Sequence, residues 1–189
     1  MSQGSTSSIC SLQNASRVYG TKSVPIPALR DVSLDIKHGE FVGILGPSGC
    51  GKSTLLSVLG LLERLDGGSY LLGGQDTSKM GFDQRALLRG RNIGWVFQTF
   101  NLLSDLTVFE NIALPLRYGK VPRAEHTNRV REIMGQVGLS RKEDAYPPKF
   151  RSQRRNYLIA LMHKVQKCHY TAFSAVGVGS LRALNSSVC

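Results

Sequence analysis

The stretch GPSGCGKS at residues 46–53 fits the pattern G-x-x-x-x-G-K-[ST] without a mismatch. A short apolar run, FVGIL at residues 41–45, precedes it and predicts a buried parallel strand. The apolar residues that follow, 54–62, predict a helix. Strand, glycine-rich loop and helix in this order are the context of a phosphate-binding P-loop. A chance glycine-rich turn is the alternative, and the match of both motif and context argues against it.

The residue types in this loop suit a nucleotide polyphosphate. Its glycines let backbone N–H groups approach the phosphates, because no β-carbon stands in the way. The first turn of the following helix adds further N–H groups and the positive end of the helix dipole. A lysine contributes a full charge toward the β- and γ-phosphates, and a serine hydroxyl is placed to ligate Mg²⁺. The motif therefore predicts a nucleotide site made of Gly46, Pro47, Ser48, Gly49, Cys50, Gly51, Lys52 and Ser53.

The composition is that of one ordinary domain, because 189 residues are enough to bury a core. Residues 1–8 hold no apolar signal region, and the longest apolar stretches are too short to span a bilayer. We therefore expect a soluble, cytoplasmic chain. The cysteines have no C-x-x-C spacing, which predicts reduced thiols rather than zinc ligands or disulfides; they are Cys10, Cys50, Cys168 and Cys189.

The net charge of +11 suggests nucleic-acid binding, but the charge is unevenly distributed. All 13 acidic residues lie at or before Asp144. After it come only basic residues, namely Lys149, Arg151, Arg154, Arg155, Lys164, Lys167 and Arg182. This difference divides the chain into two unlike parts. No nucleic-acid partner is expected, because the excess charge lies outside the part that carries the motif.

Loosely alternating apolar residues at 9–19 and 28–36 predict two strands of a small antiparallel sheet, joined by a turn around Pro25 and Pro27. Tyr19 ends the first of these strands. An aromatic ring on a strand end can stack on a nucleotide base, which contributes about 1–3 kcal/mol. Ordinary packing is the commoner role of a tyrosine that precedes a glycine.

Further along the chain, glycine pairs on both sides of residues 69–72 predict a hairpin, and residues 93–97 predict a second buried strand that ends in Gln98. Between them, Asp83 suits the cap of a helix over residues 84–89.

Two further helices form a predicted α-helical lobe after the β-rich core. Thr107 and Glu110 have the spacing of a capping box that opens a helix running to about Leu114, and Pro115 is expected to end or kink that helix. Pro122 suits the first position of the next helix, and Gly138 a stop. Its apolar face comprises Val130, Ile133, Met134 and Val137.

With these segments placed, residues 11–148 resemble the nucleotide-binding subunit of ABC transporters. The resemblance rests on SRVYG at 16–20, ALRDVS at 28–33, GEFV at 39–42, the P-loop, GWVFQ at 94–98, FNLL at 100–103, LTVFEN at 106–111 and LPL at 114–116. Together these stretches look like the branch that serves macrolide exporters and lipoprotein-releasing complexes.

The resemblance implies an α/β fold, with a P-loop NTPase core, an antiparallel β subdomain and an α-helical lobe. It implies that Tyr19 stacks on adenine and that the phosphate and magnesium site extends from Gly46 to Thr54. Gln98 is the residue implied to reach Mg²⁺, together with Ser53, and to report to the membrane subunit. The implied ligands are ATP and Mg²⁺. The implied partner is a membrane permease in trans, so the chain would be cytoplasmic and peripheral on the inner face of the membrane.

The chain departs from the family pattern after Pro148. The family has the signature L-S-G-G-Q there, whereas residues 149–155 are KFRSQRR. About twenty residues later the family has an apolar strand that ends in Asp-Glu and then a switch histidine. The present chain has no acidic residue after Asp144, and neither His163 nor His169 follows a strand of that kind. We therefore expect ATP binding without catalytic residues, and the missing signature argues against the nucleotide-binding homodimer of the family.

The expected organisation is the first part of a nucleotide-binding domain at residues 1–148 and a non-matching, basic, poorly packed tail at residues 149–189, so that the fold is incomplete at its C-terminal end. A frameshift, fusion or truncation is favoured over a degenerate paralogue, because resemblance and composition change near the same point. A fragment without function, a P-loop kinase and a GTPase are the alternatives. The chain has no guanine-recognising N-K-x-D, and the segment around Gln98 fits neither enzyme.

Overall fold

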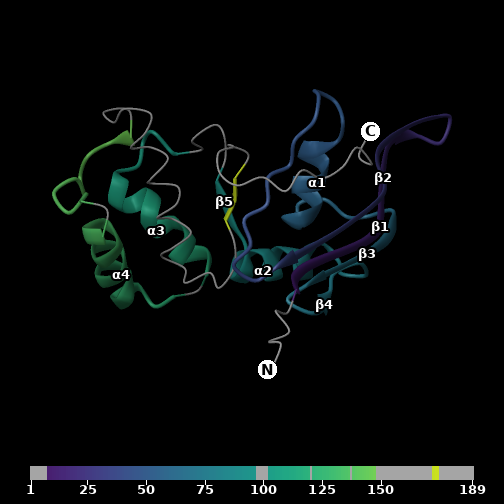
Figure 1. The fold of residues 1–189 in the computed structure, drawn as a ribbon. Coiled ribbons are helices and arrows are strands. Elements are labelled where there is room, and N and C mark those ends of the chain that lie inside the picture. Colours follow the sequence, from purple (N-terminus) through teal and green to yellow (C-terminus); the bar gives the residue numbers. More distant parts are fainter. Residues whose placement is uncertain (1–7, 97–101, 120, 137, 148–171, 175–189) are drawn as a thin grey trace, which may run out of the picture. The chain divides into compact units, whose positions relative to one another are not determined.

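The computed structural model describes residues 8–96, 102–119, 121–136, 138–147 and 172–174. These residues fall into two compact units that divide between Ala86 and Leu87 (Figure 1). The first unit, up to Ala86, is built on a β-sheet, and the second unit, from Leu87 on, on two helices and a pair of short strands. Within the described ranges, no helix is long and apolar enough to cross a membrane.

The first unit contains a four-stranded antiparallel sheet in the order β2-β1-β3-β4. The long strands β1 (Ser8–Thr21) and β2 (Val24–Lys37) form a hairpin, so both strands predicted from the alternating pattern are confirmed. The turn lies at Lys22 and Ser23 rather than at the prolines. Pro25 and Pro27 belong to β2, which the sheet accommodates because β2 is an edge strand, where a missing N–H removes no ladder bond.

Apolar side chains of the sheet and of helix α1 (Lys52–Leu59) are buried in the first unit. Strands β1 and β2 bury Leu12, Ala15, Leu29, Val32, Leu34 and Ile36, and α1 buries Leu55, Val58 and Leu59. Each large side chain of this kind contributes about 1.5–3 kcal/mol when it is fully buried. Tyr70 of β3 (Gly67–Leu72) donates its hydroxyl to the Leu59 carbonyl at 2.7 Å, and burial raises the pKa of this hydroxyl. The sheet is thus bonded to the end of α1.

The strand predicted before the P-loop is absent, because residues 41–45 have no strand structure. Phe41 and Leu45 are 60% and 57% exposed, which is incompatible with a buried strand. A parallel strand depends on hydrogen bonds to neighbours on its flanks. Among the described residues no strand pairs with this segment, so its apolar composition alone does not make it a strand.

The predicted glycine-flanked hairpin is confirmed, with β3 paired to β4 (Gln75–Asp76). Helix α2 (Phe82–Asn92) follows and begins earlier than predicted. Asp83 lies inside its first turn, so the prediction that Asp83 caps the helix is wrong. The Gln84 side chain instead accepts the Gly81 N–H at 3.0 Å, which satisfies an N–H group at the helix start.

In the second unit, helix α3 (Val108–Tyr118) begins with the predicted capping box. The Thr107 hydroxyl accepts the Glu110 N–H at 3.2 Å, and the Glu110 carboxylate accepts the Thr107 N–H at 2.8 Å. The helix does not end at Pro115, one of the two expected effects of this proline, since it continues to Tyr118 rather than to about Leu114. Leu116, beyond the proline, is fully buried in the cluster that α3 forms with α4, and this packing maintains the last turn despite the missing N–H.

Helix α4 (Arg123–Gln136) starts directly after Pro122, one residue later than predicted. Val130, Ile133 and Met134 are buried against α3, as the apolar pattern predicts, while Val137 lies outside the described residues. Gly138 has a φ of +69°, and the N–H of the next residue, Leu139, returns to the Met134 carbonyl at 2.9 Å. The predicted glycine stop is therefore confirmed.

The second unit also contains a parallel pair of short strands, β5 (Gly94–Val96) and β6 (Ala172–Ser174). Strand β5 confirms the strand predicted around Ile93, which is 3% exposed. Strand β6 lies within the part of the chain that we expected to be a non-matching tail. This segment of residues 149–189 pairs with β5 in a two-stranded sheet of its own.

Candidate nucleotide-binding site

The P-loop leads directly into α1, with Gly51 as the N-cap residue. Gly51 has a φ of +90°, and a β-carbon there would lie 2.3 Å from the Ala28 carbonyl oxygen. Any other residue would therefore clash with the backbone of β2 and adopt a strained conformation. The glycine keeps the P-loop in close contact with the sheet at Ala28.

The N-terminus of α1 is suited to an anion. Gly51 has no side chain to cap the helix, and the first turn contains no acidic residue that would neutralise the helix dipole. The first N–H groups of a helix have no partner inside the helix, and together with the dipole they favour negative charge. The local structure thus offers backbone donors at the position that the P-loop motif predicts.

Lys52 is half-buried and bends back over the P-loop. Its Nζ donates to the Gly46 carbonyl at 2.8 Å and to the Pro47 carbonyl, and lies 3.6 Å from the Cys50 sulfur. The ammonium is therefore held against the backbone of the P-loop, the segment for which the motif predicts a phosphate site. Carbonyl oxygens are neutral acceptors, and phosphate oxygens would form stronger, charge-assisted bonds with the same group.

Of the two predicted magnesium ligands, the described structure contains one. Ser53 is exposed on the first turn of α1, directly after Lys52, so its hydroxyl is accessible to a bound ion. Thr54 is half-buried on the same turn. Gln98, the second predicted ligand, lies outside the described residues.

Tyr19 lies near the end of β1, and the residue is 36% exposed. It pairs with Ile26 across the hairpin, close to Ala28, the residue of β2 that contacts Gly51. The guanidinium of Arg17 lies 4.8 Å from the centre of the Tyr19 ring. Tyr19 and the P-loop therefore belong to the same unit, and the hairpin that carries Tyr19 on β1 approaches the P-loop at Ala28 of β2.

Two features of the described structure, one in each unit, were not predicted from the sequence. Arg17 was not selected as a site residue, although it precedes Tyr19 by two and so shares its face of the strand. Strand β6 was also missed, because its pairing with β5 joins residues far apart in the chain. The strand itself holds one strongly β-forming residue, Phe173, which is too weak a signal to predict it. The family pattern has its Asp-Glu strand in this part of the chain, and Ala172–Ser174 contains no carboxylate.

A P-loop that enters a helix beside an antiparallel sheet defines a P-loop nucleotide-binding protein. The family model described as "ABC transporter" matches residues 29–159, which is more than half of the chain. The chain therefore belongs to the ABC transporter family.

Relatives and solved structures agree with this assignment. An "Uncharacterized ABC transporter ATP-binding protein" of Thermotoga maritima is 46% identical over 123 residues, which cover 65% of this chain and 53% of that protein. The "Methionine import ATP-binding protein MetN" of Bordetella avium is 47% identical over 138 residues, which cover 72% of this chain and 37% of that protein. The chain thus aligns with about half or less of the length of these relatives.

Among solved structures, the dimeric ATP-binding cassette MJ0796 bound to ADP and Pi is 32% identical, with a TM-score of 0.74. The alignment covers 86% of this chain and 72% of that chain. The predicted fold class, a P-loop NTPase core with an antiparallel sheet and helices, is confirmed. The relatives' names do not support the narrower resemblance to macrolide exporters and lipoprotein-releasing complexes. Several of these relatives are named for methionine import.

Proposed function

We propose that this chain binds MgATP at residues 46–54, as the ATP-binding subunit of an ABC transporter. The observation that carries the proposal is the position of the Lys52 ammonium, which is bonded to the P-loop carbonyls at the uncapped N-terminus of α1. Three sources of positive potential converge there: the ammonium, the helix dipole and the backbone N–H groups. Tyr19, on the same hairpin that contacts Gly51, would take the adenine.

The magnesium part of the proposal uses the exposed Ser53 hydroxyl as one ligand of the ion. Gln98 is proposed as the second contact, on the family resemblance alone. Family membership supports ATP and Mg²⁺ as the ligands, and the solved relative in a post-hydrolysis state contains ADP and Pi.

The transport direction that we propose is import. Relatives 42–47% identical to this chain are named for methionine import, and these names favour a small imported solute over a macrolide or a lipoprotein. We propose a separate membrane permease as the partner, with the chain on the cytoplasmic face of the membrane. The solved neighbours are dimeric cassettes, which supports a second copy or a paired cassette as a further partner.

The proposed organisation keeps the ATP-binding part within residues 1–148. Residues 149–189 contain neither the signature nor a carboxylate, and no residue is proposed as catalytic. The 189-residue chain is therefore proposed to bind ATP without hydrolysing it.

Calorimetric titration of MgATP into the full chain and into its Lys52→Ala variant tests this proposal. Loss of the ammonium should remove most of the affinity, because charge-assisted bonds to phosphate disappear. Lys79→Ala is the matched control, since Lys79 is an exposed lysine in the turn after β4. Unchanged ATP affinity in a folded Lys52→Ala sample would falsify the assignment of the P-loop.

A further inference from the structure

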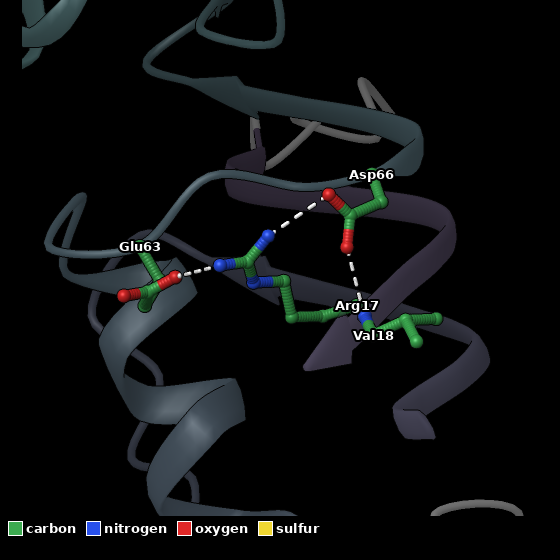
Figure 2. A network of polar contacts seen from close by, with 4 residues as sticks. All are labelled: Arg17, Val18, Glu63 and Asp66. Carbon is green, nitrogen blue, oxygen red and sulfur yellow. Dashed lines mark hydrogen bonds and ion pairs between the residues drawn. The ribbon is translucent and has the colours of Figure 1, made fainter. Parts of the chain in front are cut away.

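Arg17 is the centre of a network of polar contacts at the end of β1, shown in Figure 2. Its guanidinium contacts Glu63 at 2.7 Å and Asp66 at 2.8 Å, and its side chain is only 16% exposed. Asp66 also accepts the backbone N–H of Val18 at 2.8 Å. The side chain of Arg17 and the backbone of Val18, the two residues before Tyr19, are thus both fixed.

Asp66 continues the bonding of β1 beyond its ladder with β3. That ladder ends at Ser16 and Gly67, and the Asp66 N–H still donates to the Ser16 carbonyl at 2.9 Å. The Asp66 carboxylate then accepts the N–H of Val18. The end of β1 that bears Tyr19 is therefore held by a side chain where a neighbouring strand is missing.

The remaining contact of Arg17 is the Tyr19 ring, whose centre lies 4.8 Å from the guanidinium carbon. A cation at this distance is attracted to the face of an aromatic ring. Burial alone would lower the pKa of the Arg17 guanidinium, but Tyr19, Asp66 and Glu63 raise it above its ordinary value. The charged group thus lies against one face of the ring, while Tyr19 as a whole residue is 36% exposed.

Glu63 connects this network to the helix that carries the P-loop lysine. The N–H groups of Leu62 and Glu63 both donate to the Ser57 carbonyl, at 2.8 and 3.1 Å. Glu63 is therefore anchored to the last turns of α1, whose first turn bears Lys52 and Ser53. A continuous series of contacts runs from α1 through Glu63 and Arg17 to Tyr19.

We propose that Arg17 is a positioning residue for base recognition, which fixes the Tyr19 ring for a stacked purine and ties it to the helix that binds the phosphates. This inference rests on the proposed function, because it requires a nucleotide whose base stacks on Tyr19. With the guanidinium against one face of the ring, the purine stacks on the other. The ring then needs no ordering when the nucleotide binds, and such preorganisation increases affinity.

The test compares MgATP with magnesium tripolyphosphate, which has no base, in titrations of the full chain. Arg17→Met removes the charge and keeps a long side chain, and we expect it to weaken ATP binding about three- to tenfold. Tripolyphosphate binding should not change. Arg17→Lys, which keeps a cation near the ring, should recover part of the ATP affinity. Arg30→Met is the matched control, because Arg30 is an exposed arginine of β2, and it should change neither ligand's affinity.

A double variant separates positioning from general stability. In a Tyr19→Ala background, Arg17→Met should cause no further loss of ATP affinity, since no ring remains to be positioned. Arg17 would be shown to support only the fold if Arg17→Met lowered the ATP affinity as much in the Tyr19→Ala background as in the parent chain. The same conclusion would follow if Arg17→Met weakened the binding of ATP and of tripolyphosphate equally. If Arg17→Met does not fold, Glu63→Gln replaces it. The proposal is overturned if Glu63→Gln fails to weaken ATP binding while leaving tripolyphosphate binding unchanged.

The same titrations separate a failure of this proposal from a failure of the proposed function, MgATP binding at the P-loop, on which it rests. If Tyr19→Ala leaves ATP affinity unchanged while Lys52→Ala abolishes it, the P-loop site stands and the stacking role of Tyr19, with that of Arg17, is wrong. If Lys52→Ala also leaves binding unchanged, the proposed function itself is wrong.

Discussion

At the scale of single residues, Lys52 and Tyr19 divide the proposed binding of a nucleotide between charge and stacking. Lys52 is held at the P-loop by carbonyl oxygens, and Tyr19 is held at the end of β1 by Arg17. The contacts of Lys52 are local, because the carbonyl groups that hold its ammonium belong to residues five and six positions earlier in the chain. Arg17 could not be predicted from its neighbours in sequence, because its partners Glu63 and Asp66 lie more than forty residues away.

Replacing Tyr19 by Ala should weaken ATP binding by about 1–3 kcal/mol, the usual contribution of one stacked base. Tyr19→Trp should keep most of the affinity, since a larger ring offers at least the same stacking surface. Tripolyphosphate should bind equally to all three proteins. Titration calorimetry measures these affinities, and equal losses for ATP and tripolyphosphate would assign Tyr19 to packing instead.

At the scale of elements, prediction succeeded where neighbouring residues decide the structure. The capping box of α3 and the glycine stop of α4 depend on residues within a few positions of one another, and both are present. Prediction failed where distant residues decide it. Residues 41–45 are apolar but have no strand partner among the described residues. Helix α3 continues past Pro115 because Leu116 is packed in the cluster with α4. Strand β6 forms through its pairing with β5.

The capping box makes a prediction about acid stability. Hydrogen bonds from the Thr107 backbone and hydroxyl lower the pKa of the Glu110 carboxyl below its ordinary value. A lowered folded pKa means that this group stabilises the fold fully above its unfolded pKa, and that the contribution is lost as pH falls through the folded value. Glu110→Gln should therefore reduce the dependence of the unfolding free energy on pH in the acidic range.

Urea unfolding at a series of pH values measures this effect. Glu132→Gln is the control, because Glu132 is an exposed carboxylate of α4, and it should leave the pH dependence near that of the parent chain. An identical pH profile for Glu110→Gln and the parent chain would mean that the carboxylate in the capping box adds no stability.

At the scale of the whole molecule, the chain combines a complete P-loop motif with a C-terminal part that lacks acidic residues. Carboxylates that precede the P-loop are engaged elsewhere in the first unit. Asp35 accepts the Ser8 hydroxyl, Asp31 accepts the Ser16 hydroxyl, and Glu40 accepts the Lys37 N–H. Each would have to leave the sheet or its turn to act as a base at the γ-phosphate.

We therefore expect the 189-residue chain, with ATP and Mg²⁺, to release phosphate no faster than its Lys52→Ala variant. Loss of a positioned general base typically lowers a rate by about 10²–10⁴-fold. Loss of the signature also removes contacts that would enclose the γ-phosphate away from water. A phosphate-release assay on both proteins measures this. Turnover clearly above the Lys52→Ala background would reveal catalytic groups in the chain that are not assigned here.

The central claim is that one site on the first unit holds both the base and the phosphates of ATP. Photolabelling with 8-azido-ATP tests it most directly, because the azide attaches to residues beside the purine. We predict labelling of the tryptic peptide at residues 18–22, which contains Tyr19, with loss of the label in excess ATP and in Lys52→Ala. Label confined to other peptides, or undiminished in Lys52→Ala, would contradict the claim.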